Sequence, residues 1–153
     1  MPIEVDQSNK IERTEKDTIL ALSNDERRAI LIPARVKREA IAWLKGRKRS
    51  SKMIYLRLFA AGLFILLRPC LANIIKRGQQ IVIDTEYEGH ESKIKGMLLR
   101  YAHAAGFQLS KEAVSFVRVG KSSSAHQTAW QVQRGRLAPD HRVSLNELIE
   151  LVK

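Results

Sequence analysis

The chain of 153 residues contains a single cysteine, Cys70, and four histidines. One cysteine excludes a disulfide within the chain and any metal site built from several cysteines. The histidines show none of the spacings that zinc sites use. Chemistry based on thiols or on a histidine-rich metal site is therefore not expected.

The sequence also lacks an apolar run long enough to span a membrane. The longest candidate, Met53 to Leu67, contains Arg57 and is followed by Arg68 and Pro69, whereas a spanning helix needs roughly 20 apolar residues. The run is apolar all round, which is typical of a buried core helix. The polar N-terminus does not resemble a signal peptide. We expect a cytoplasmic protein with no membrane partner.

Acidic residues are scarce relative to basic ones. There are 16 Asp and Glu against 27 Lys and Arg, which gives a net charge of +11. Such an excess favours a polyanionic partner, and nucleic acid ahead of an acidic membrane surface. A basic protein that is merely soluble, or one that a missing subunit neutralises, stays open. We expect DNA or RNA as the partner, with self-association or a protein partner as a further option.

The densest cluster of positive charge lies between residues 45 and 52, where five of eight residues are cationic. Arg47, Lys48 and Arg49 are predicted to contact phosphates without reading sequence. Trp43 beside them is suited to stacking on a base. The alternative is a solvated loop next to a core tryptophan.

Carboxylates are concentrated after one apolar strand, in the stretch from Gln80 to Glu91. In a strand, Asp84, Glu86 and Glu88 would point to one face and repel each other. A divalent cation resolves such repulsion, so we predict an Mg²⁺ or Mn²⁺ site formed by Asp84, Glu86 and Glu91. The alternative is exposed carboxylates that pair with nearby basic side chains, namely Lys93, Lys95 or Arg100.

A second candidate site is the turn at residues 120–124, which precedes a predicted helix. Its Gly-Lys-Ser is not a phosphate-binding loop of the NTPase type, because Ser115 stands where that motif needs glycine. The start of a helix still favours an anion, so Lys121, Ser122 and Ser124 are predicted phosphate ligands. His126 is the candidate proton shuttle or phosphate contact, and together with Asp84 and Glu86 it completes the predicted catalytic group. The alternative is a histidine that only caps the helix or borders the core.

The order of predicted elements indicates an α/β fold. Residues 1–18 have no aromatic residue and no sustained period, so they are predicted to be a mobile polar tail, or a short added strand at Ile3 to Val5. Residues 19–153 are predicted to be one domain with a small, mainly parallel sheet flanked by helices. Between residues 23 and 33 a capping-box pattern competes with a strand that ends at a proline. Helices are expected at 34–44, 53–75, 91–105, 125–134 and from 144, and strands at 80–84 and 114–119.

Residues 54–136 resemble the RNase H-like superfamily, and especially its uncharacterised nuclease-like and mobile-element members. Asp84 and Glu86 match the acids at the end of a middle strand of that family, and Ser122 to Ser124 match a late serine-rich turn. The resemblance implies a three-layer fold. Two departures stand out: Ala129-Trp130 occupies the place of a typical Ala-Asp pair, and no opening strand with a leading catalytic Asp is recognisable.

Three functions follow from these observations. The first is a metal-dependent nuclease that processes phosphodiesters at Asp84 and Glu86. The second is a non-catalytic, basic nucleic-acid-binding module. The third is a structural or assembly protein that docks through its apolar helix. Metal-dependent cleavage would select the first, and binding with a steep salt dependence but no cleavage would select the second.

Overall fold

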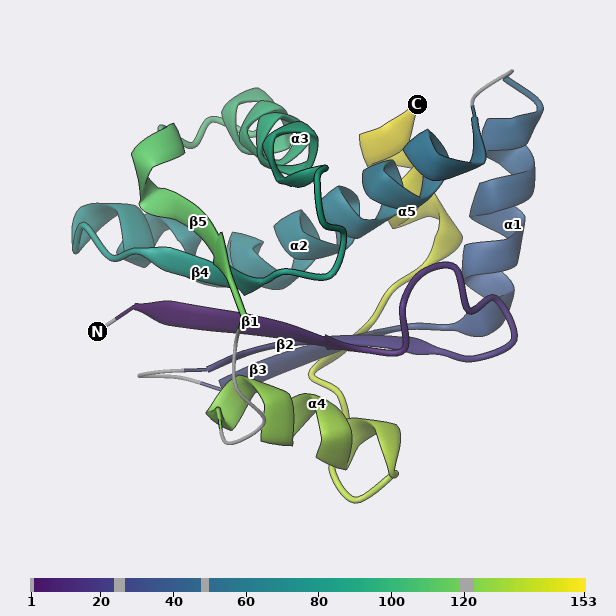
Figure 1. Ribbon diagram of the computed structural model, residues 1–153, viewed down its shortest axis with the longest axis horizontal. Helices are drawn as coiled ribbons and strands as arrows, with labels where there is room; N and C mark the ends of the chain where they lie inside the picture. Colours follow the sequence, from purple (N-terminus) through teal and green to yellow (C-terminus); the bar gives the residue numbers. More distant parts are fainter. Residues whose placement is uncertain (1, 24–26, 48–49, 119–122) are drawn as a thin grey trace.

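The computed structural model describes residues 2–23, 27–47, 50–118 and 123–153. An opening run of three strands is followed by two consecutive helices, and strands and helices alternate after them (Figure 1). In chain order the elements are β1 (Ile3–Ser8), β2 (Thr18–Ser23), β3 (Arg27–Ile32), α1 (Ala34–Lys45), α2 (Ser51–Lys76), β4 (Ile81–Asp84), α3 (Glu91–Ala104), a short 3-10 turn (Lys111–Ala113), β5 (Val114–Val117), α4 (Ser124–Gln133), β6 (His141–Arg142) and α5 (Leu145–Val152).

The strands form one mixed sheet in the order β5-β4-β1-β2-β3-β6. The opening strands β1, β2 and β3 pair antiparallel, whereas β4 runs parallel to both β1 and β5. The expected α/β class is confirmed, and the two strands predicted at 80–84 and 114–119 do pair in parallel, as β4 and β5. The expectation of a mainly parallel sheet is wrong, because short connections make the first three strands antiparallel neighbours.

The prediction of a mobile tail over residues 1–18 is also wrong, whereas its alternative, a short added strand at Ile3 to Val5, is confirmed. Residues Ile3–Ser8 form β1, which lies between β4 and β2 in the middle of the sheet. Its odd positions Ile3 and Val5 are buried in the main core, while Asp6 on the opposite face is buried as well. The chain therefore has an opening strand that carries an aspartate, which the sequence interpretation had judged to be missing.

Helix α2 is the buried core helix that its apolar sequence predicts. The Ser50 side chain accepts a hydrogen bond from the N–H of Met53 and caps the start, and Gly78 follows the end with a positive φ of 63°. The helix continues through Pro69 instead of ending there. By length and composition α2 could cross a membrane, yet 61% of its most apolar window is buried inside the protein.

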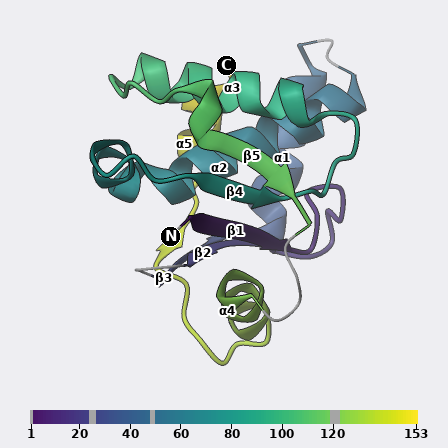
Figure 2. The ribbon, with the colours of Figure 1, turned by 60° about the vertical axis from the view of Figure 1, so that its left-hand side comes forward.

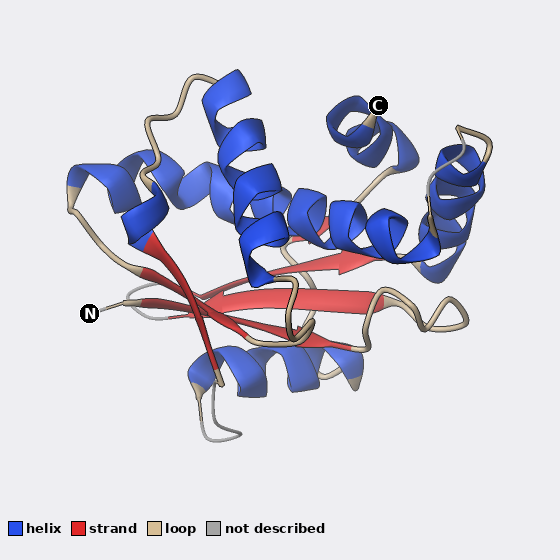
Figure 3. Cartoon of the chain, turned by 45° about the horizontal axis from the view of Figure 1, so that its top comes forward, coloured by secondary structure: helices blue, strands red, loops and turns tan. Residues whose placement is uncertain are grey.

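The helices divide unequally between the two faces of the sheet. Figures 1 and 3 show α1, α2, α3 and α5 on one face, and α4 is the one described helix on the other. The turned view of Figure 2 shows α4 lying beneath β1, β2 and β3. We call these the four-helix face and the α4 face. No described helix covers β4 and β5 on the α4 face, where Val117 is 46% exposed.

The remaining local predictions were mostly correct. Helix α1 begins directly after Pro33, and α5 begins after Ser144, whose hydroxyl accepts a hydrogen bond from the N–H of Glu147. In the conflict between residues 23 and 33 the strand prevails as β3, because its apolar side chains are buried on both faces. The capping box there includes residues 24–26, which lie outside the described residues. The two-residue strand β6 was not predicted.

Candidate functional site

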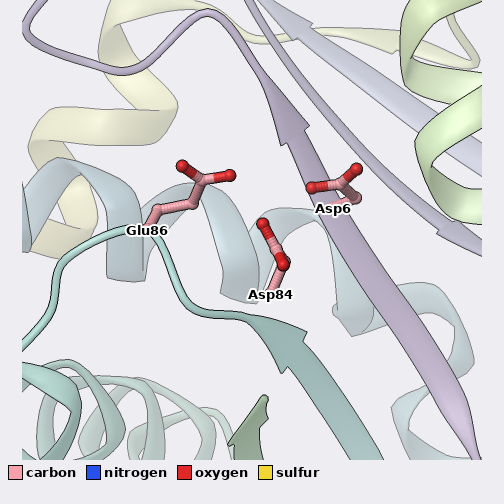
Figure 4. A group of neighbouring side chains, drawn as sticks. All are labelled: Asp6, Asp84 and Glu86. Atoms are coloured by element: carbon pink, nitrogen blue, oxygen red, sulfur yellow. The ribbon is translucent and has the colours of Figure 1, made fainter. Parts of the chain in front are cut away.

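Three carboxylates meet on the α4 face of the sheet (Figure 4). They are Asp6 of β1, Asp84 at the end of β4, and Glu86 two residues beyond it. One carboxylate oxygen from each lies within 4.8 Å of the other two. Figure 4 shows the three side chains pointing toward one another. We call this group the acidic cluster.

The strand register produces the cluster. In the parallel pair, Val5 of β1 lies opposite Ile83 of β4, so Asp6 and Asp84 follow one step later on both strands. Because side chains alternate between faces, both carboxylates leave the apolar core side and point to the α4 face. Beyond Asp84 the N–H of Thr85 still donates to the carbonyl of Val117 at 2.9 Å, which keeps the chain close to the sheet as it reaches Glu86.

Burial makes the repulsion within the cluster costly. Asp6 is only 4% exposed, and this burial raises the pKa of its carboxyl above the ordinary value. Burial, a hydrogen bond to Asp84 and the negative charges of Asp84 and Asp6 together raise the pKa of Glu86 to about 8. At neutral pH the cluster therefore retains a proton that an ordinary carboxyl would have lost.

Two side chains that can carry positive charge lie against the cluster, one of them the permanently basic Lys10 and the other His126. His126 lies in the first turn of α4, where the Ser123 hydroxyl accepts a hydrogen bond from its backbone N–H. Its ring Nδ1 is 2.8 Å from Oδ2 of Asp6. Nζ of Lys10 is 3.9 Å from Oε2 of Glu86 and donates to the Glu86 carbonyl at 3.1 Å. Among the described residues, one lysine and one histidine thus contact the three carboxylates.

The donor set fits a hard divalent cation. All three side chains offer oxygen, which Mg²⁺ and Mn²⁺ prefer, and no thiol belongs to the group. Asp6 is already oriented by two contacts, because the N–H of Gln7 donates to its Oδ1 at 2.8 Å while His126 holds Oδ2. Such support from surrounding groups is a usual property of carboxylates that bind metals.

The structure brings together part of the predicted metal site. Asp84 and Glu86 belong to the acidic cluster, and the predicted catalytic residue His126 touches it through Asp6. Glu91 is not a member of the group that could hold a metal, because it begins α3 and lines a groove there with Lys95. Glu88 pairs with Arg118 at the surface.

The predicted phosphate ligands divide between the two sides of the sheet. Ser124 is exposed at the start of α4, and Lys121 and Ser122 lie outside the described residues. Arg47 follows α1 on the four-helix side, with its guanidinium 3.8 Å from the centre of the Trp43 ring. Lys48 and Arg49 lie outside the described residues.

The sequence interpretation missed Asp6. The signal was present, because Ile3, Val5 and the polar residues between them alternate as a half-buried strand does. The run is short and lacks aromatic residues, so the strand predicted there as an alternative covers only Ile3 to Val5. That strand stops one residue before Asp6, and Asp6 therefore had no predicted neighbour.

No family model, no curated protein and no solved structure matches this chain.

Proposed function

We propose that the protein is a nuclease that depends on a divalent metal, with the acidic cluster as its active centre. The observation that carries the proposal is the convergence of Asp6, Asp84 and Glu86 within 4.8 Å at the edge of a basic protein. Grouping carboxylates in a partly buried site is costly, because each one makes the others harder to ionise. A cation would remove that cost.

Each residue has a distinct role in this proposal. Asp6, Asp84 and Glu86 would hold Mg²⁺ or Mn²⁺. The bound cation would lower the pKa of a water molecule and polarise a phosphodiester. His126 holds Asp6 in place and is the group nearest to the cluster that is suited to moving a proton. Lys10 lies beside Glu86 and would offset its charge once that carboxyl ionises.

Nucleic acid is the substrate that the charge distribution favours. The net charge of +11 attracts a polyanion to the whole molecule, whereas the acidic cluster alone would repel it. A cation in the cluster would convert that one repulsive point into an attractive one. Nucleic acid is such a polyanion, and its phosphodiester bonds are among the bonds that metal sites of this kind cleave.

An RNase H-like fold is part of the same proposal. The resemblance lacked an opening strand with an aspartate, and β1 with Asp6 now supplies one next to Asp84. The other departure persists, because Ala129-Trp130 of α4 offers no carboxylate. His126, one turn earlier on the same helix, is the side chain that reaches the cluster instead.

The decisive experiment measures Mn²⁺ binding by calorimetry at low salt, followed by cleavage of labelled single- and double-stranded DNA and RNA. We expect Asp84→Asn and Asp6→Asn to abolish binding and cleavage together. Glu88→Gln is the matched control, because Glu88 comes from the same acidic stretch but pairs with Arg118 outside the cluster. Glu91→Gln should also behave like the wild type.

Wild-type protein that neither binds Mn²⁺ nor cleaves any of these substrates would contradict the proposal. Binding of nucleic acid that weakens steeply with salt, without cleavage, would select a non-catalytic binding module instead. The stacking of Arg47 on Trp43 beside the basic stretch favours that second function. Docking through α2 has less support, since most of its apolar side chains are buried within the fold.

A further inference from the structure

A tryptophan between two arginines stands exposed on α4. Trp130 is 38% exposed, although tryptophan is usually well buried. The guanidinium of Arg134 lies 4.8 Å from the centre of its ring, and that of Arg136 lies 5.4 Å away. We call these three residues the Trp130 cluster.

The end of α4 positions this cluster. Arg134 follows Trp130 by four residues, so the two side chains are neighbours on the helix surface. Gly135 then adopts a positive φ of 74°, and the N–H of Arg136 donates to the carbonyl of Gln131 at 2.9 Å. This reversal of the chain after the helix brings Arg136 back beside Trp130. Helix and turn together hold both cations at one ring.

The two arginines have no acidic partner within reach. Among residues 2–23, 27–47, 50–118 and 123–153, no carboxylate oxygen lies within 4 Å of either guanidinium, and the sequence contains no Asp or Glu from residue 124 to 139. Arg118, by contrast, pairs with Glu88. As far as the described part of the chain goes, the side-chain N–H donors of Arg134 and Arg136 are thus free for an external anion.

The Trp130 cluster is also close to the acidic cluster. His126, whose ring contacts Asp6, precedes Trp130 by four residues. His126, Trp130 and Arg134 therefore form one row along α4, with successive members about 6 Å apart. A strand of nucleic acid whose phosphate sits at the acidic cluster could follow this row over one or two nucleotides.

We propose that the Trp130 cluster binds a single-stranded segment of nucleic acid beside the acidic cluster. An unpaired base stacks on Trp130, and Arg134 and Arg136 bind the phosphates on either side of it. A base stacks on an indole more strongly than an exposed cation does, so it can displace one arginine from the ring and leave that arginine to the phosphate. The inference rests on the proposed function for its substrate, but not for cleavage.

The test measures binding without metal, so that it is independent of catalysis. Fluorescence anisotropy in EDTA at low salt would follow a labelled twelve-residue oligothymidylate, the matching oligouridylate, and a DNA duplex of the same length. The variants are Trp130→Ala, Trp130→Phe, and Leu137→Ala as the control. Leu137 is equally exposed at 38% and lies on the same segment, but it has no aromatic ring.

We expect Trp130→Ala to weaken binding of the single strands about 5- to 100-fold, while Trp130→Phe retains most of the affinity. The duplex should lose much less, because its bases are already stacked. Arg134→Ala and Arg136→Ala should each reduce the salt slope for single strands by about 0.7. A difference between the DNA and RNA strands would identify which sugar the segment carries.

Single-strand affinity within twofold of the wild type in Trp130→Ala would overturn the inference, as would an equal loss for the duplex. The two proposals fail separately. Binding that depends on Trp130 in a protein without Mn²⁺-dependent cleavage supports the Trp130 cluster and contradicts the nuclease. Cleavage that Trp130→Ala leaves unchanged, with unchanged affinity, does the reverse.

Discussion

The two faces of the sheet differ in what they bury. On the four-helix face, α1, α2, α3 and α5 cover a large apolar core that includes fully buried aromatic side chains such as Phe59 and Phe64. On the α4 face a small cluster of side chains lies under one helix: Ile19, Ala21, Ala29, Leu31, Ala129 and Val132. The acidic cluster lies beside it. The first face thus supplies most of the folding energy.

The two faces also differ in the partners that they provide for buried charged groups. Lys37 on the four-helix side is fully buried, and burial lowers its pKa to about 8, but Nζ donates to the Arg13 carbonyl at 2.7 Å and to Oγ1 of Thr18 at 2.9 Å. Two oxygen atoms of the protein therefore accept hydrogen bonds from the Lys37 ammonium group. The three carboxylates on the α4 face repel one another instead. Carboxylates with pKa values raised in this way are found more often at functional sites than elsewhere.

The largest expected effect comes from the core of the four-helix face. Phe64→Ala should lower the free energy of unfolding by about 3–5 kcal/mol, because it removes a ring that packs against Tyr101 and Phe107 and leaves a cavity. Val132→Ala on the α4 face should cost only about 1–2 kcal/mol. Urea denaturation of both variants measures the difference. Equal losses would mean that the two faces contribute alike to stability.

The second effect is a loss of stability between pH 4.5 and 8 that comes from the α4 face, whereas Lys37 on the four-helix side acts only above about pH 8. The pKa of Glu86 is about 8 in the folded protein against an ordinary 4.5, so between these values the folded state holds a proton that the unfolded state has released. The contribution of this carboxyl to stability is therefore fully present below pH 4.5 and is lost as the pH rises through 8, by about 2–4 kcal/mol. Urea denaturation in EDTA across this range measures the fall.

Glu86→Gln provides the comparison for that experiment. The variant cannot ionise at position 86, so the difference between its curve and that of the wild type isolates the contribution of this carboxyl. We expect the two curves to meet near pH 4.5 and to separate toward pH 8, with the variant the more stable. A wild type that gains stability over this range relative to the variant would show that Glu86 is paired, not repelled.

Asp84→Asn should have a smaller effect on the free energy of unfolding. It should raise it, whereas a core mutation lowers it. Removing one of three like charges should stabilise the metal-free protein by about 1–2 kcal/mol at pH 8. The wild type should regain stability when Mn²⁺ is added, because a ligand that binds only the folded state stabilises it, whereas the variant should not respond. Thermal melts with and without Mn²⁺ measure both. A variant less stable than the metal-free wild type would mean that Asp84 is structural.

The sequence predicted those elements whose signals are local. The apolar run of α2, the hydroxyl cap of α5 at Ser144 and the strand leading to Asp84 each depend on neighbouring residues, and each is present. A helix start or a buried strand is determined largely by residues within one or two turns. This is why their bounds could be read without knowledge of the tertiary structure.

Only Asp84 and Glu86 of the acidic cluster were predicted, because the third member, Asp6, joins them through the pairing of two strands that are far apart in the sequence. Asp6 and Asp84 are 78 positions apart in the sequence, and they meet because β1 inserts between β4 and β2. Glu91 is not part of the acidic cluster, although it lies only a few residues from Glu86 in the sequence. Strand order is set by the burial of the whole sheet, so no local pattern revealed which acids would converge.

The smallest expected effect on stability belongs to Trp130. Its ring is 38% exposed and its two arginines are at the surface, where such contacts with cations contribute little. Trp130→Ala should therefore change the free energy of unfolding by less than about 0.5–1 kcal/mol, which thermal and urea denaturation can measure. A loss as large as that of Phe64→Ala would make Trp130 part of the core of the α4 face. A large, exposed aromatic side chain that adds almost nothing to stability is instead what a binding surface requires, because its contacts are completed only by a partner.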